Sequence, residues 1–225
     1  EEHRDVQAGE GALSQFQLGI QRTTLNSVLF PVSGSNLSWD IQLNGGLLGG
    51  DGNFTKQTFE SELWAPVWTF GGERGSPTII ALGTSLRGGA IIGNSADFPF
   101  ERFWMGGVQF GERLRGYDET SVTPFGFFPE NSRQIRDIDR LGNAYLLVST
   151  ELALRLNQQF SIHAFYDAGN VWTSFDQVNP AELFRGAGLG ATVVTPFGPI
   201  GLDYGYGFDK DLPGWQFHFT FGQGF

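Results

Sequence analysis

The chain has 225 residues, no cysteine and a net charge of −10. A nucleic-acid-binding surface needs a basic stripe, so this charge argues against a nucleic-acid partner. No stretch approaches the roughly 18 uninterrupted apolar residues that a membrane helix needs, which excludes a helical membrane protein. The content of 22 Phe and 33 Gly is typical of strands and turns.

Alternation of apolar and polar residues, interrupted by turn signals, predicts about ten strands and no helix. In 35–45, the apolar residues Leu37, Trp39 and Ile41 alternate with polar ones. The segments 143–156 and 199–209 alternate in the same way. The predicted strands span residues 13–23, 35–45, 54–66, 77–90, 100–107, 143–156, 160–172, 184–195, 199–209 and 215–225.

The last segment, 215–225, carries the strongest alternation. Small or polar residues separate its aromatic side chains, which are Trp215, Phe217, Phe219, Phe221 and Phe225. A period of two places all the aromatic residues on one face of a strand. The pattern recurs along the sequence, and the sequence ends on phenylalanine, so we interpret the face as lipid-exposed, in a transmembrane β-barrel. A soluble β-sandwich is the alternative, and it would have to explain the polar, glycine-rich faces of 184–195 and 199–209.

The connections between the predicted strands differ in character. Those at 26–34 and 195–199 are short and punctuated by proline and glycine, as tight turns are. Those at 44–53, 91–99 and 108–142 are longer and more polar. Short turns on one side and long loops on the other are typical of a bacterial outer-membrane barrel.

Few residues suggest metal or enzyme chemistry. The three histidines have no ligand spacing, so we predict no metal site and no cofactor. On one strand face His163 and Asp167 lie about 13 Å apart, too far for an acid–base pair. The glycines of 186–190 lack the spacing of a nucleotide loop, and we interpret them as small residues where something packs closely. An outer-membrane protease or phospholipase remains the enzymatic alternative.

One motif carries more information. The segment Leu114-Arg115-Gly116-Tyr117 lies in the longest loop, ahead of Glu151 and Asp167 in two later strands. At these residues the chain resembles the superfamily of BamA and its relatives, which insert or translocate proteins in outer membranes. In that family a loop bearing Val/Ile-Arg-Gly-Phe/Tyr folds back into the barrel, and its arginine meets acidic residues of the lumen wall. The resemblance implies that Arg115 is this arginine, with Glu151 and Asp167 as its partners.

Further matches extend along the chain, at Phe103–Gly107, Asn26–Gly34 and Thr195–Pro199 and in the final strand, where Gly222 matches the family's kink glycine. Side-chain parity agrees with the motif. Glu151 shares its face with Ser149 and Arg155, and Asp167 shares its face with His163. Both carboxylates therefore face the lumen, where an arginine fork can satisfy them with bidentate bonds.

The resemblance implies an all-β, antiparallel transmembrane barrel, with residues 1–225 forming one domain. Full members of the family have sixteen strands, so about ten strands represent the C-terminal portion of the barrel. Loop 108–142 is then extracellular and folded into the lumen. We favour a portion of a longer protein, with closure as a smaller barrel as the alternative. The seam, where the last strand of a barrel meets the first, would be formed here by Phe217, Phe219, Phe221, Gly222 and Phe225.

The function implied is insertion and folding of β-barrel proteins in the bacterial outer membrane through a lateral seam, without enzymatic activity. The implied partners are outer-membrane lipids and nascent barrel clients, together with accessory lipoproteins and periplasmic POTRA domains that are not in this chain. A secretion pore of the same superfamily would share every motif, and a passive porin is a further alternative.

Overall fold

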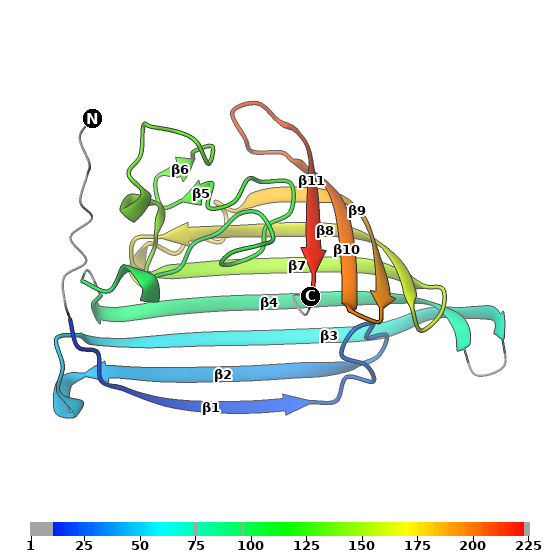
Figure 1. Cartoon of the computed structure of the whole chain (residues 1–225), viewed down its shortest axis with the longest axis horizontal. Coiled ribbons are helices and arrows are strands. Elements are labelled where there is room, and N and C mark those ends of the chain that lie inside the picture. Colours follow the sequence, from blue (N-terminus) through cyan, green and yellow to red (C-terminus); the bar gives the residue numbers. More distant parts are fainter. Residues whose placement is uncertain (1–10, 74–75, 96, 223–225) are drawn as a thin grey trace.

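The computed structural model describes residues 11–73, 76–95 and 97–222. Nine antiparallel strands form one sheet whose order follows the chain (Figure 1). They are β1 (Gln15–Thr23), β2 (Gly34–Gly45), β3 (Asn53–Glu73), β4 (Ser76–Asn94), β7 (Ala144–Arg155), β8 (Phe160–Trp172), β9 (Phe184–Thr195), β10 (Gly198–Gly207) and β11 (Gly214–Phe221). The all-β, antiparallel prediction is confirmed. No helix among the described residues has the length and apolar character needed to cross a membrane.

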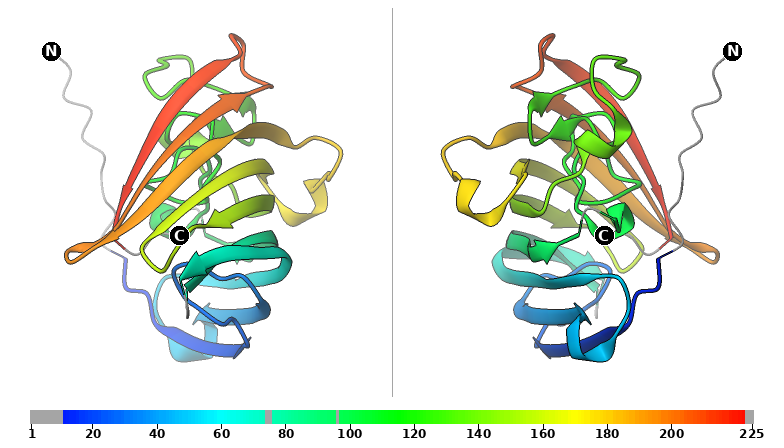
Figure 2. Two further views of the ribbon diagram at one scale, coloured as in Figure 1. Left: turned by 90° about the vertical axis from the view of Figure 1, so that its right-hand side faces the viewer. Right: turned by 90° about the vertical axis from the view of Figure 1, so that its left-hand side faces the viewer.

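The two faces of the sheet differ as the alternation predicts. In β11, Phe217 is 68% exposed whereas its neighbour His218 is 5% exposed. The same contrast separates Leu152 from Ala153 in β7. The sheet is curved, and the long loop between β4 and β7 lies on its concave side (Figure 2). The convex face therefore carries the aromatic and aliphatic rows, and the loop packs on part of the concave face, leaving every residue of β1 exposed.

The connections also differ between the two ends of the sheet. At one end lie the long loop, 95–143, and the connections 46–52, 173–183 and 208–213 (Figure 1). At the other end, 156–159 and 196–197 are short. The connection 24–33 at this end is longer, and its fold is fixed by Asn26, whose Oδ1 accepts bonds from the backbone N–H of Val32 at 2.9 Å and of Ser33 at 3.1 Å.

The strand predicted at 100–107 is wrong. The segment begins with the 3-10 helix η2 (Pro99–Glu101) and continues through isolated bridges such as Phe103–Gly142. Gly106 and Gly107 adopt φ values of 120° and 70°, which interrupt an extended backbone. Phe103 and Met105 are buried residues of the loop that follows β4. Their apolar spacing reflects this local core and not a strand.

The long loop, which we call the plug loop (95–143), has a compact structure of its own. It contains the two-residue strands β5 (Val122–Thr123) and β6 (Gly126–Phe127) and the 3-10 helix η3 (Asp137–Arg140). The buried Arg140 guanidinium donates to carbonyl oxygens within the loop, at 3.1 Å to Thr120 and 2.9 Å to Pro129. Two further 3-10 helices, η1 (Gly46–Leu48) and η4 (Phe175–Gln177), lie in other connections.

An apolar cluster joins the plug loop to the concave face. Loop residues Met105, Leu114, Tyr117 and Val122 are fully buried in it. Sheet residues complete the cluster, among them Phe54, Ile91, Tyr145, Leu147 and Val171. Burial of such side chains contributes about 1.5–3 kcal/mol each. The plug loop is therefore packed into the sheet as part of its core.

Candidate functional site: the plug-loop anchor

The site lies where the plug loop crosses the concave faces of β7 and β8. Leu114 and Tyr117 enter the apolar cluster on either side of Arg115. Between them the Arg115 side chain, only 1% exposed, turns toward two strands of the sheet. The apolar residues on both sides of Arg115 therefore hold its charged group against the concave face of the sheet.

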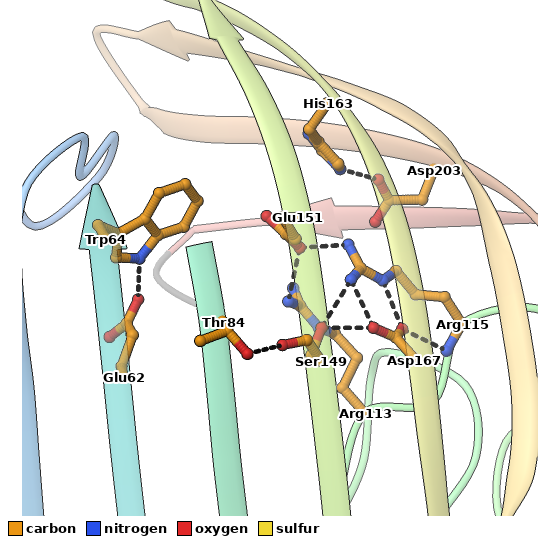
Figure 3. Close-up of polar contacts among 10 residues, drawn as sticks. All are labelled: Glu62, Trp64, Thr84, Arg113, Arg115, Ser149, Glu151, His163, Asp167 and Asp203. Atoms are coloured by element: carbon orange, nitrogen blue, oxygen red, sulfur yellow. Dashed lines mark hydrogen bonds and ion pairs between the residues drawn. The ribbon is translucent and has the colours of Figure 1, made fainter. Parts of the chain in front are cut away.

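Arg115 contacts both of the acidic residues that the sequence singled out (Figure 3). Its Nε and Nη2 donate to the two oxygens of Asp167 on β8, each at 2.7 Å. Its Nη1 lies 2.6 Å from Oε1 of Glu151 on β7. Nη2 also donates to Oγ of Ser149 at 3.2 Å. The guanidinium thus bridges two adjacent strands with charge-assisted bonds.

The surroundings keep this arginine charged. Burial by itself would lower the pKa of Arg115, but attraction to Asp167 and Glu151 outweighs it and holds the pKa above its ordinary value. The guanidinium also lies over the Phe165 ring, 3.7 Å from its centroid. Arg113 adds a second, longer ion pair to Glu151, at 3.6 Å. Sequence reasoning missed Arg113 and Phe165 as members of the site.

Glycines of β9 and β10 provide the surface on which the motif backbone rests. A Cβ atom at Gly186 would lie 2.1 Å from the carbonyl oxygen of Arg115, and one at Gly205 would lie 2.7 Å from the Gly116 nitrogen. Gly116 itself has a φ of 91°, a conformation that L side chains rarely adopt. The interpretation of alternate glycines as sites of close packing agrees with this contact.

Tyr117 attaches the motif to the loop-proximal ends of β9 and β10. Its hydroxyl donates to the carbonyl oxygen of Arg185 at 2.8 Å and accepts from the Asp209 N–H at 3.2 Å. Burial raises the pKa of this phenol, so the hydroxyl stays protonated and able to donate. Asp209 and Arg185 also form an ion pair at 2.6 Å.

The last strand contacts the motif from its polar face. The Gly116 N–H donates to Nε2 of His218 at 2.8 Å, and Gln216 donates to Asp118 at 2.7 Å. Phe217, Phe219 and Phe221 point to the opposite, convex face, where each is more than half exposed. Gly222 follows with a φ of 86°, and Phe225 lies outside the described residues. The sequence did not single out His218 or Gln216, although their parity in β11 places them on the polar face.

A second buried pair lies beside the anchor and was also missed. His163 Nε2 lies 2.7 Å from Asp203 Oδ1 (Figure 3). Gly190 separates them in the sheet, and a Cβ there would lie 1.9 Å from the Asp203 oxygen. The sequence signal for this pair was a glycine in one strand, with polar residues of the same face in the two neighbouring strands. No hydroxyl in the described part of the chain hydrogen-bonds His163, and the described residues hold no cluster of metal-ligating side chains.

Comparisons with known proteins place this architecture in a family. The model of the Omp85 superfamily domain matches residues 2–225. The outer membrane protein assembly factor BamA of Nitratidesulfovibrio vulgaris is 28% identical over 224 residues. The alignment covers 96% of this chain and 26% of that protein.

A solved structure shares the fold. The crystal structure of BamA from Haemophilus ducreyi lacking POTRA domains 1–3 superposes with a TM-score of 0.66 at 19% identity. The match covers 91% of this chain and 41% of the solved one, so the chain spans less than half the length of either relative. With its exposed aromatic rows on the convex face, the sheet is a segment of an outer-membrane barrel. The chain belongs to the Omp85 superfamily.

Proposed function

We propose that this chain is the barrel portion that closes the seam of an outer-membrane protein assembly factor, which inserts and folds β-barrel proteins. The proposal rests on the Arg115 anchor together with the relative that is named as an assembly factor. A buried arginine, bridging Asp167 and Glu151, holds a long loop against the inner wall. The loop is also packed on the concave face through an apolar cluster. The relative in N. vulgaris is named as such an assembly factor.

The proposed mechanism uses strand pairing and no bond-making chemistry. β11 is the last strand of the described sheet and pairs on one side with β10. An unpaired strand edge can template an incoming strand by β-augmentation. Gly222, just beyond β11, has a left-handed φ of 86°, a conformation that glycine adopts readily. We infer a weakly held seam that needs neither nucleotide nor cofactor, and therefore a protein that is not an enzyme.

We further propose that residues 1–225 act as one barrel domain, with loop 108–142 extracellular and folded into the lumen. Lipids of the outer membrane would contact the convex face, and nascent barrel proteins would contact the seam. Accessory lipoproteins and periplasmic POTRA domains are the proposed partners outside this chain. Both relatives are named BamA, and the solved one was crystallised without POTRA domains 1–3, which supports this arrangement.

The decisive experiment depletes the protein in its own cells and follows unrelated outer-membrane barrels by quantitative proteomics of the membrane fraction. We expect many barrels to fall together, with restoration by the wild-type gene and poor restoration by Arg115→Ala. A deficit confined to one or two exported soluble proteins would instead identify a secretion pore. Unchanged levels of all barrels would contradict the proposal.

A further inference from the structure

The backbone of β11 presents alternate residues to its free edge. Opposite residues of an antiparallel pair alternate between hydrogen-bonded and non-bonded positions. The Gly222 N–H donates to the Pro199 carbonyl at 2.9 Å, one residue beyond the Ile200–Phe221 pair. Even-numbered residues of β11 therefore bond to β10. The N–H and C=O groups of Trp215, Phe217, Phe219 and Phe221 point away from β10, to an edge with which no described strand pairs.

The plug loop reaches this edge at one point. Gln109 Nε2 donates to the carbonyl oxygen of Phe219. By the alternation above, this acceptor belongs to the seam edge and not to the ladder with β10. The other loop contacts with β11, at His218 and Gln216, involve side chains on its polar face. Gln109 alone among these occupies a backbone group that a pairing strand would use.

Glu119 holds Gln109 in this position. Its carboxylate accepts bonds from the backbone N–H groups of Val108 at 2.7 Å, Gln109 at 3.0 Å and Phe110 at 3.2 Å. The turn is closed by the Glu112 N–H, which donates to the Trp104 carbonyl at 2.8 Å. Because one carboxylate binds three backbone donors, the 108–110 turn has a defined position. The Gln109 contact therefore belongs to an ordered segment.

We propose that Gln109 is a latch on the seam edge. Its side-chain amide occupies the Phe219 acceptor, so a strand that pairs with β11 in this register must displace it. The latch couples the plug loop to the seam, because movement of the 108–110 turn frees the edge. The inference rests on the proposed function, in which β11 pairs with other strands, and it assigns to Gln109 a positioning role within it.

The test measures strand capture by the full-length protein in vesicles of phosphatidylethanolamine and phosphatidylglycerol. The probe is a synthetic ten-residue peptide of alternating aromatic and polar residues with one central photo-crosslinker, and cross-links are mapped by mass spectrometry. Wild type is compared with Gln109→Ala and Gln109→Glu, the latter similar in size but unable to donate as a carboxylate. The matched control is Gln134→Ala, which truncates an exposed glutamine of the same loop.

We expect both Gln109 variants to raise cross-linking to β11 about two- to tenfold. This is the change in a binding equilibrium that the loss of one hydrogen bond produces. The control should match wild type, and protease protection of 108–142 should stay unchanged in all four proteins. Equal capture in all four, including none, overturns the latch. So does higher capture that comes with loss of loop protection, because general loosening would then explain it.

Insertion of a purified barrel client into the same vesicles is measured in parallel. Failure of wild type to accelerate insertion contradicts the assembly function, while the peptide comparison still decides the latch. The two ideas can therefore fail separately.

Discussion

At the scale of single residues, the anchor consists of charges that depend on one another. Arg115 and Asp167 are each only 1% exposed, so neither charge can be compensated by bulk water. Removal of one member of a buried ion pair costs about 3–5 kcal/mol, mainly because the remaining charge is stranded. The same burial explains why Ser149, a neutral residue, is recruited as a further hydrogen-bond partner.

Arg115→Ala should therefore release the plug loop. We expect rapid protease cleavage within 108–142 and an unfolding free energy lower by about 3–5 kcal/mol. Arg115→Lys should lie in between, because one ammonium cannot reproduce the fork that meets both oxygens of Asp167. Arg136→Ala removes an exposed ion pair of the same loop and should leave the cleavage rate unchanged. Equal cleavage of the Ala variant and wild type would contradict the anchor.

The glycine surface gives a second residue-scale prediction. In Gly205→Ala the new methyl group would lie 2.7 Å from the Gly116 nitrogen and 3.1 Å from its Cα. Since both are backbone atoms, the motif must move, and we expect a loss of about 1–3 kcal/mol with a more protease-sensitive loop. The control is Gly214→Ala, where the nearest atom lies at 3.9 Å. If the two alanine variants are equally stable, the close packing is not important for the anchor.

At the scale of elements, β11 combines three environments along eight residues. One face carries exposed aromatic side chains, the other binds the plug loop, and one edge lacks a strand partner among the described residues. Stacking of Tyr204 on Phe217, at 4.3 Å between centroids, supports the strand from β10 on the convex face. The strand is thus held by β10 and by the loop.

Lysine substitutions at two adjacent residues of β11 should differ in their effect on stability. Phe217→Lys places a charge on the convex face, where lysine near the bilayer midplane costs about 2–4 kcal/mol. Gln216→Lys places the same charge beside Asp118, the present partner of Gln216, and should be tolerated. Urea unfolding in lipid vesicles measures both. Similar destabilisation by the two substitutions would contradict the assignment of faces.

At the scale of the whole molecule, the curved sheet separates a lipid-facing surface from an interior filled by the plug loop. Tryptophan side chains lie on both surfaces of the sheet. Trp39 and Trp215 are 47% and 55% exposed on the convex face, whereas Trp172 is 5% exposed. Trp64 lies on the concave side, where its indole donates to Glu62 at 2.6 Å (Figure 3).

Brominated acyl chains should distinguish these groups. In single-tryptophan variants reconstituted with dibrominated phosphatidylcholine, we expect strong fluorescence quenching of Trp39 and Trp215 and weak quenching of Trp64 and Trp172. The physical reason is contact, because bromine quenches only indoles that it closely approaches. Strong quenching of Trp172, or none of Trp215, would contradict the proposed orientation of the sheet in lipid.

Much of this structure could be predicted because strands have a local period. Parity alone placed Glu151 and Asp167 on one face and the aromatic residues of 215–221 on the other. The same reasoning failed at 100–107, where alternate apolar residues fill the core of a loop. A period of two reports that alternate side chains are buried, and not which element buries them.

The sequence by itself determined the class of fold and the two faces of the sheet, because these depend on neighbours along a strand. The pairing of Arg115 with its acids was implied by the resemblance of one motif to a known family. Only the tertiary structure decided that His163 meets Asp203 across Gly190, that Gly186 and Gly205 receive the motif backbone, and that Gln109 reaches the edge of β11. These contacts join residues 40 to 110 positions apart. They depend on sheet register and on the path of the plug loop, which no local pattern encodes.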